Sequence, residues 1–498
     1  MKLNSLLFTS LAMLSLATVG QTEKQPIKED TWHNPINYKQ EIIESIKKSP
    51  FLKTSPSFLL QRSATDVKAV ARPTFPDFEF VNGINMAWDK FSSDIGYEVT
   101  PTYTTEYHPN WAHFSNVFES VANSGGNVVR WWFHTDGATS PVFDKNDEFV
   151  VENPDFFLTD LKTLLDLAVE KKIKVQICLW SFDMLKGGPG RWRVNSARNK
   201  KILTSDAHLQ AYLDNSLVPL VKAIGNHPGL YAWELFNEPE GMTTEYASHW
   251  PDFTDKVSIT DIQKTVNKMA SAIRNAQPGV KITNGALGFI SGVDNLIFGY
   301  HNNYTDARLA EKGGKSDGYL DFYNIHYYDW AKESGSPFHN TFASTNLDKP
   351  TIIAEYYPQD TFGVTVDQLG PELINKGWHG TLVWSWTDKG WDAMKKAVKS
   401  TTEALDEITL NISDFSSLES KISIYPNPVV EAVNITSISK KISEITICDI
   451  AGNHIFNKKL NGAIETTIDL TRFLAGTYII SLKSANVSKV LKKKFVKI

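Results

Sequence analysis

The stretch LYAWELFNEP at residues 230–239 joins an apolar run to two polar residues and a proline. Its first seven residues have the length and aromatic content of a buried β-strand, and Pro239 ends that run. The strand therefore delivers Glu238 at its C-terminal end. A second stretch, TIIAEY at residues 351–356, delivers Glu355 in the same way. The two stretches predict two strands that each present one glutamate at the same end.

The alternation of short apolar runs with amphipathic stretches continues over residues 78–405 and predicts eight strands. They cover residues 80–86, 127–133, 174–180, 230–236, 280–284, 322–327, 350–355 and 380–386. Between them, apolar residues recur at helical spacing, as in Leu158, Leu161, Leu164, Leu165 and Ala168. This order predicts an α/β fold, a (β/α)8 TIM barrel. The alternative is a doubly wound open sheet, but no Gly-rich phosphate loop follows any predicted strand.

In such a barrel the reactive groups lie at the C-terminal ends of the strands. The candidate residues near those ends are Glu238, Glu355, Asn237, Arg130, His134, His326, Tyr328, Trp384, Trp386, Trp88 and Trp180. The spacing of two between Trp384 and Trp386 predicts that both face one side of the last strand. Each residue alone has an ordinary explanation, such as a solvated carboxylate or a buried core histidine. Their convergence on one face of one fold favours a site.

Two carboxylates at strand ends suit glycoside hydrolysis, in which one protonates the leaving oxygen and the other attacks the sugar or stabilises its cation. We expect Glu238, in an aromatic-walled pocket, to be the general acid. We expect Glu355 to be the nucleophile, kept ionised by donors such as Arg130 and Tyr328. Asn237 offers an amide that can donate to a sugar 2-hydroxyl. This chemistry needs no metal and no organic cofactor.

The composition excludes several other classes of protein. At 498 residues and 42% hydrophobic content, the chain exceeds one ordinary domain. Its net charge of −5 argues against nucleic acid as a partner. The 14 tryptophans fit either sugar-stacking rings or a large core. The two cysteines, Cys178 and Cys448, lie in different predicted domains, which excludes a disulfide framework.

Both ends of the chain differ from the barrel in composition and in the spacing of their apolar residues. Residues 1–20 have the positive start, apolar stretch and small residues of a secretory signal peptide, and residues 21–77 form a polar leader. After the predicted barrel domain, 78–405, we expect a linker at 406–418 and a small all-β sandwich at 419–498. Its predicted strands are 422–425, 444–450, 464–470 and 477–482.

Five motifs in residues 78–400 resemble those of glycoside hydrolase family 5. They are NVVRWWF (127–133), WELFNEPE (233–240), YNIHYYDW (323–330), TIIAEYY (351–357) and LVWSWTDKG (382–390). The resemblance implies a retaining barrel hydrolase with Glu238 as acid/base and Glu355 as nucleophile. It also implies that Asn237 binds the 2-hydroxyl, that Arg130, His326 and Tyr328 surround the reacting sugar, and that Trp384 forms its floor. The family usually has a histidine near the end of strand three. Here Trp180 and His134 are the candidates for that volume.

The C-terminal module resembles the sorting domain of the type IX secretion system. The resemblance rests on KISIYPNPVVEAVNI (421–435), ITICDIAGNHIF (445–456) and LAGTYIISLK (474–483). It implies export across the outer membrane by the secretion machinery, so that the protein is secreted, extracellular or attached to the outer surface. A carbohydrate-binding module is the alternative, but these residues contain no tryptophan for sugar to stack on.

We therefore expect a secreted, monomeric, retaining endo-β-1,4-glycanase that acts on a polysaccharide. Mannan is the favoured substrate, because residues 131–132 and 384–386 resemble those of mannanase-type members. The Asp388–Lys389 pair resembles endoglucanases equally, so cellulose is the runner-up. A non-catalytic glycan-binding protein and a transglycosylase are the remaining hypotheses.

Overall fold

The computed structural model describes residue 75 and residues 77–498, apart from 100–102, 188–193, 248–249, 251, 254, 296, 420–421, 438–440, 450–452 and 485–489. The predicted signal peptide and almost all of the predicted leader lie outside the described residues.

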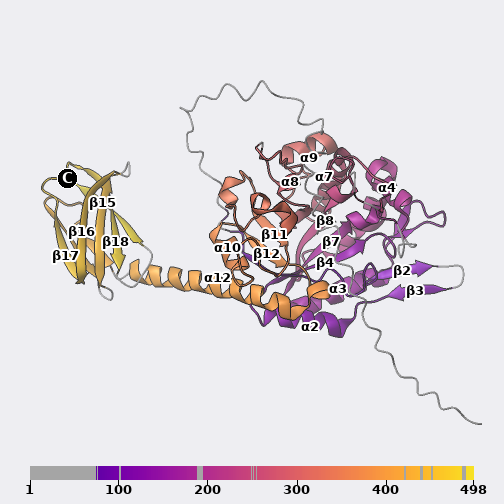
Figure 1. The fold of residues 1–498 in the computed structure, drawn as a ribbon, viewed down its shortest axis with the longest axis horizontal. Helices are drawn as coiled ribbons and strands as arrows, with labels where there is room; N and C mark the ends of the chain where they lie inside the picture. Colours follow the sequence, from indigo (N-terminus) through magenta and orange to yellow (C-terminus); the bar gives the residue numbers. More distant parts are fainter. Residues whose placement is uncertain are drawn as a thin grey trace, which may run out of the picture.

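Eight parallel strands close into a barrel in the order β1-β12-β11-β10-β9-β8-β7-β4. Figure 1 shows the barrel with its helices around it. They are β1 (Val81–Asn85), β4 (Val128–Thr135), β7 (Lys174–Ser181), β8 (Leu230–Asn237), β9 (Ile282–Ala286), β10 (Tyr323–His326), β11 (Thr351–Glu355) and β12 (Gly380–Val383). Each coincides with a predicted strand to within a few residues. The first and last strands pair, with Val81 beside Gly380. The predicted (β/α)8 barrel is confirmed.

Helices surround the strands. They are α2 (Trp111–Ala122), α3 (Asp155–Glu170), α4 (Ser196–Thr204), α5 (Asp206–Tyr212), α6 (Val218–Ile224), α7 (Ile259–Ala276), α8 (Phe289–Gly292), α9 (Asp306–Gly313), α10 (Leu369–Asn375), α11 (Trp386–Lys389) and α12 (Trp391–Glu419). Helix α3 buries the predicted stripe from Leu161 to Ala168. Helix α7 begins at a capping box in which Ser258 and Asp261 exchange hydrogen bonds.

One predicted helix is interrupted. The apolar stripe of residues 209–224 is divided between α5 and α6 by a π-helical turn at Leu213–Leu217. Pro219 follows in the first turn of α6. Because proline has no N–H to donate, a regular α-helical ladder cannot continue through it, and a wider turn fits at this point.

Two small hairpins lie in the loops that follow barrel strands. One consists of β2 (Gly96–Val99) and β3 (Thr104–Tyr107), and the other of β5 (Val142–Phe143) and β6 (Val150–Glu152). The first follows β1 and the second follows β4, so both belong to the C-terminal face of the barrel, where sites lie in this fold. Neither hairpin was predicted.

The C-terminal module is an all-β structure, as predicted. One sheet contains β13 (Ile422–Tyr425), β14 (Ala432–Ser437) and β17 (Glu465–Asp469). The other contains β16 (His454–Ala463), β15 (Ile442–Asp449), β18 (Gly476–Ser484) and β19 (Val490–Lys497). Strands β14, β16 and β19 were not predicted. Residues 458–459 and 492–494 place lysines in β16 and β19, which weakens the apolar alternation.

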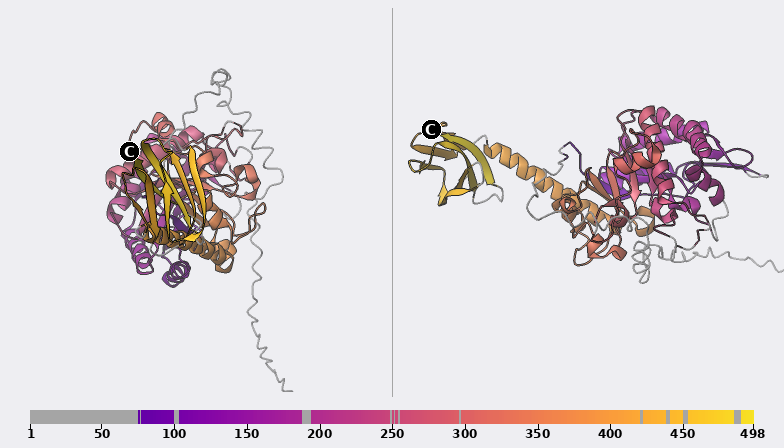
Figure 2. Two further views of the ribbon diagram at one scale, coloured as in Figure 1. Left: turned by 90° about the vertical axis from the view of Figure 1, so that its left-hand side faces the viewer. Right: turned by 90° about the horizontal axis from the view of Figure 1, so that it is seen from above.

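Helix α12 connects the two parts of the chain. It runs through residues 406–418, the predicted linker, so that this segment is helical. Figure 1 and the right-hand view of Figure 2 show the C-terminal sheets at the far end of this helix from the barrel. Among the described residues, no helix combines the length and the apolar character that crossing a membrane requires.

Candidate active site

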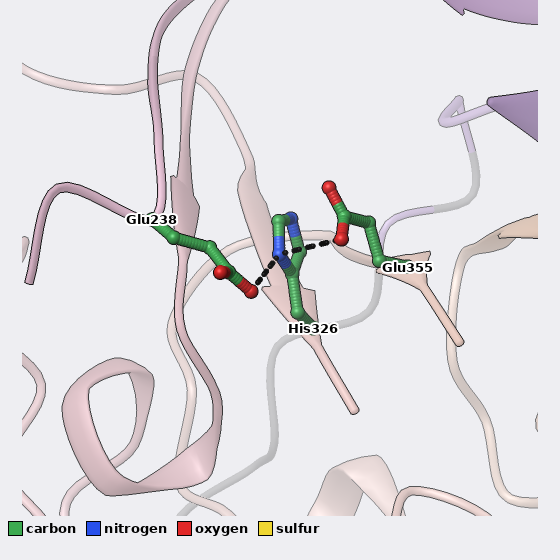
Figure 3. Close-up of side chains that lie close together, drawn as sticks. All are labelled: Glu238, His326 and Glu355. Carbon is green, nitrogen blue, oxygen red and sulfur yellow. Dashed lines mark hydrogen bonds and ion pairs between the residues drawn. The ribbon is translucent and has the colours of Figure 1, made fainter. Parts of the chain in front are cut away.

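Glu238 and Glu355 lie at the C-terminal ends of β8 and β11, with His326 at the end of β10 between them (Figure 3). His326 Nδ1 is 2.8 Å from Glu238 Oε1 and 3.5 Å from Glu355 Oε2. One atom from each of the three side chains lies within 4.8 Å of the other two. All three residues are buried. The structure thus brings three of the predicted site residues into direct contact.

The backbone of Glu238 has an unusual conformation. Its φ of 44° and ψ of 52° are left-handed, a region that residues other than glycine seldom occupy. Its N–H donates to the carbonyl of Gly285 at 2.8 Å, and Pro239 begins a short 3-10 turn, Pro239–Met242. Such a conformation persists only where the surroundings hold it in place, and it is often found at functional sites.

Both oxygens of Glu355 accept hydrogen bonds from predicted site residues. Arg130 Nη1 donates to Oε1 at 2.5 Å and the Tyr328 hydroxyl donates to Oε2 at 2.7 Å. Burial raises the pKa of Glu355 to about 7, while Arg130 and Tyr328 act in the opposite direction. The predicted donors are therefore present, but burial outweighs their effect.

Arg130 is fully buried and holds a second glutamate that the sequence analysis missed. Its Nε and Nη2 donate to Glu234 at 2.6 and 2.8 Å, a bidentate pair. Its Nη1 also donates to Asn85 Oδ1 at 2.7 Å, and its Nη2 to Asn237 Oδ1 at 2.8 Å. Burial opposes the charge on Arg130, but Glu234 and Glu355 raise its pKa well above the ordinary value.

A signal for Glu234 was available. It is a charged residue inside the strand β8, among the apolar residues of the run 230–236. Such a residue needs a buried partner. Asn85, at the end of β1, carried no comparable signal.

Tryptophans form a wall beside Arg130. The ring of Trp384 lies 5.9 Å from that of Trp88 and 5.7 Å from that of Trp132. The Arg130 guanidinium is 5.5 Å from the Trp132 ring. Trp384 Nε1 donates to Asp388 at 2.7 Å, which fixes the plane of the indole. Trp384 and Trp88 therefore lie together, next to the charged network.

The prediction that Trp384 and Trp386 face the same side is wrong. Strand β12 ends at Val383, and Trp386 is the first residue of α11. Its ring stacks on Trp391 at 5.6 Å and lies edge-on to His113 at 6.0 Å. Because the strand has already ended, the two-residue period no longer applies.

His134 and Trp180 lie in a separate aromatic cluster. Their rings are 4.9 Å apart, and both contact Tyr212. His134 Nδ1 is 2.9 Å from Ser140 Oγ, and burial lowers the pKa of His134 to about 3, so that the ring is neutral. The pairing of β4 with β7 shifts register just before this point, between Trp132 and Thr135. Such an irregularity breaks the alternation that would place His134 beside Arg130.

Glu238, His326 and Glu355 also offer atoms of the types that bind metal ions. However, both oxygens of Glu355 already accept hydrogen bonds from Arg130 and Tyr328. The fixed positive charge of Arg130 opposes a second cation at the same carboxylate. The arrangement therefore suits proton transfer and nucleophilic attack better than cation binding.

Two buried glutamates a few ångströms apart at the C-terminal end of a (β/α)8 barrel define the chain as a glycoside hydrolase. Residues 88–390 match the model of the cellulase family, glycosyl hydrolase family 5, and the chain belongs to this family. Residues 423–497 match a secretion system C-terminal sorting domain, so the protein is exported, as predicted.

Characterised relatives support this assignment. The chain is 29% identical to a mannan endo-1,4-beta-mannosidase of Mytilus edulis, over 64% of this chain and 87% of the relative. It is 30% identical to one of Cryptopygus antarcticus, over 62% and 81%. The crystal structure of the beta-mannanase from the blue mussel Mytilus edulis matches with a TM-score of 0.57 at 27% identity, over 65% of this chain and 92% of that one.

Proposed function

We propose that this protein hydrolyses β-1,4-linked mannan at internal bonds, with retention of configuration. The proximity of Glu238 to Glu355 supports the retaining mechanism, since one oxygen of each lies within 4.8 Å of the other. Retaining enzymes separate their carboxyl groups by roughly 5–5.5 Å, whereas inverting enzymes leave roughly 6.5–9.5 Å for a water molecule. The relatives named above are mannan endo-1,4-beta-mannosidases that align along most of their own length.

In the first step, Glu355 attacks the anomeric carbon while Glu238 gives its proton to the leaving oxygen. The glycosidic C–O bond breaks, and a covalent ester forms between the sugar and Glu355. In the second step, Glu238 takes a proton from water, and the resulting hydroxide displaces Glu355 from the anomeric carbon. His326 holds Glu238 through its 2.8 Å contact, while Arg130 and Tyr328 hold Glu355.

Asn237 and Trp384 position the reacting sugar in this proposal. Arg130 donates to the Asn237 oxygen, which leaves the amide NH2 group as the part of Asn237 that can donate to the sugar 2-hydroxyl. That hydroxyl is axial in mannose and equatorial in glucose, so its partner affects the choice of substrate. Trp384, fixed by Asp388, provides the flat floor, and Trp88 extends the same wall.

The substrate is tested by reducing-sugar release from galactomannan, glucomannan, carboxymethylcellulose and barley glucan. We expect the full-length protein to cleave both mannans, and the Glu355→Ala variant to cleave neither. Cleavage confined to the two glucans would favour the endoglucanase hypothesis, which is also compatible with membership of the cellulase family. Binding without cleavage would favour a non-catalytic glycan-binding protein. Products longer than the starting substrate, formed at high substrate concentration, would favour a transglycosylase.

We further propose the division of the chain. Residues 1–20 are a signal peptide, 21–77 a leader, 78–405 the catalytic domain, 406–418 a helical linker and 419–498 the sorting domain. The barrel strands lie between Val81 and Val383, and the C-terminal strands between Ile422 and Lys497, in agreement with these limits. We also propose that the protein acts as a monomer, and a site in which one chain supplies Glu238, Glu355, Arg130 and Tyr328 is compatible with this.

The Tyr328→Phe variant should shift the acidic side of the pH profile of kcat/KM to higher pH. The Tyr328 hydroxyl stabilises the ionised form of Glu355, so its removal raises the pKa of Glu355 further from about 7. Protonated Glu355 cannot attack, and activity is then lost at a higher pH. A hydrogen bond to a charged group contributes about 1.5–3 kcal/mol, which corresponds to a shift of about one to two pH units.

The matched control for this variant is Tyr327→Phe. The Tyr327 hydroxyl lies 3.0 Å from Thr361 Oγ1. Its removal should leave the acidic limb where it is in the wild type. A Tyr328→Phe profile that coincides with that of Tyr327→Phe would contradict the assigned role of Tyr328.

A further inference from the structure

Glu240 is a second buried carboxylate two residues beyond Glu238, and the mechanism above does not use it. It lies in the 3-10 turn Pro239–Met242 and is fully buried. The Tyr304 hydroxyl donates to its Oε1 at 2.5 Å, and the Leu287 N–H donates to its Oε2 at 3.1 Å. Burial raises the pKa of Glu240, while these donors and Ser291 favour its ionised form. Uncharged donors thus supply the hydrogen bonds that a buried carboxylate needs to offset the free-energy cost of its burial.

These donors come from a different part of the barrel. Leu287 directly follows β9, and Tyr304 lies shortly before α9. Glu240 therefore ties the turn after β8 to the segment after β9. A second attachment lies nearby, where the Glu238 N–H donates to the carbonyl of Gly285 in β9. The chain is thus held at Glu238 N and again at the Glu240 side chain, and the backbone of Glu238 is left-handed between these two points.

We propose that Glu240 is a positioning residue for Glu238. Its carboxylate fixes the turn after β8, and this holds Glu238 in its left-handed conformation with the carboxyl group directed at His326. The inference rests on the proposed role of Glu238 as acid/base. Glu240 itself does not touch the reacting atoms.

A misplaced Glu238 affects only the reactions that need its proton. Mannan has a poor leaving group, a sugar hydroxyl, so breaking its glycosidic bond needs protonation by Glu238. A 2,4-dinitrophenyl β-mannobioside releases a stable phenolate, which needs no proton. In both cases kcat/KM reports the first step, the formation of the glycosyl-enzyme. The ratio of kcat/KM for the two substrates therefore separates a loss of acid catalysis from a general loss of structure.

The experiment measures that ratio for the full-length wild type and the variants Glu240→Ala, Glu240→Gln and Tyr304→Phe. Glu238→Ala is the reference for the complete loss of the acid. Glu245→Gln is the matched control, because Glu245 lies in the same loop but accepts from the Ile259 N–H at the start of α7, at 3.1 Å.

We expect Glu240→Ala to lose about 100-fold in kcat/KM on mannan, as a misplacement of about 1 Å does. On the aryl glycoside the loss should stay within about 3-fold, because the acid contributes little there. Tyr304→Phe and Glu240→Gln should lose less, in the same selective pattern, and Glu245→Gln should match the wild type. If Glu240→Ala does not fold, the two milder variants decide by the same ratio.

Two results would overturn the inference, and they differ. Equal losses on both substrates in the Glu240 and Tyr304 variants, with a selective loss in Glu238→Ala, would show that Glu240 is merely structural. A Glu238→Ala variant without any selective loss would show that Glu238 is not the acid. In that case the proposed function fails, and the inference fails with it.

Discussion

Replacing Glu355 by alanine should reduce kcat on mannan on the order of 10⁴-fold or more, the scale observed when a nucleophile is removed. The variant has no group to form the glycosyl ester, and its Arg130 and Tyr328 donors then surround an empty position. The measurement is the initial rate of reducing-sugar release, with folding checked by thermal unfolding. Added azide should restore turnover by occupying the vacated space, and its product should have the α configuration, since only one displacement has occurred.

The control for this prediction is Glu372→Ala on α10, a glutamate of the outer helices. It should retain the wild-type rate. A Glu355→Ala variant that keeps a substantial rate would contradict the covalent mechanism. An azide product with the β configuration would contradict the assignment of Glu355 as the attacking group.

Replacing Arg130 by methionine should destabilise the protein by about 3–5 kcal/mol, the effect of removing one partner from a buried ion pair. Arg130 is the cation that contacts both Glu234 and Glu355. Without it, the pKa of Glu355 rises further from about 7, so the loss of stability grows as the pH rises and shrinks in acid, where Glu355 is protonated. Urea unfolding of wild type and variant at pH 5 and pH 8 measures this difference.

A double variant tests whether the lost stability comes from the unpaired charge. Arg130→Met combined with Glu234→Gln removes both members of the bidentate pair. It should regain much of the stability that Arg130→Met loses, since burying a neutral amide is less unfavourable than burying a lone carboxylate. Activity should stay low, because Glu355 still lacks the charged one of its two donors. A double variant no more stable than Arg130→Met would contradict this explanation.

The barrel could be predicted from sequence because its strands are parallel and buried on both faces. Such strands are nearly continuous apolar runs, as in residues 230–236, and they are easily found. The site could be predicted because a barrel collects its reactive groups at one end. Glu238, Glu355, His326 and Tyr328 followed from that rule, whereas Arg130 reaches Glu355 from within β4.

The remaining differences arise where local geometry departs from a regular strand. A register shift in β4 separates His134 from Arg130, and an early end to β12 separates Trp386 from Trp384. Neither leaves a clear pattern in the residue types. Glu234 was missed for another reason. It lies inside its strand and not at the end, and its partner, Arg130, is 104 positions away along the chain.

The hydrogen bonds of Asn85 on β1 have a consequence for the assembly of the site. Its side chain accepts from Arg130 and donates to the carbonyls of Ala354 and Leu382, on β11 and β12. The first strand of the barrel and its last two strands thus meet at the residue that orients Arg130. This centre cannot form until β12 has paired with β1. Closure of the barrel and assembly of the catalytic centre are therefore one event, and a chain truncated before β12 would lack the contacts that orient Arg130.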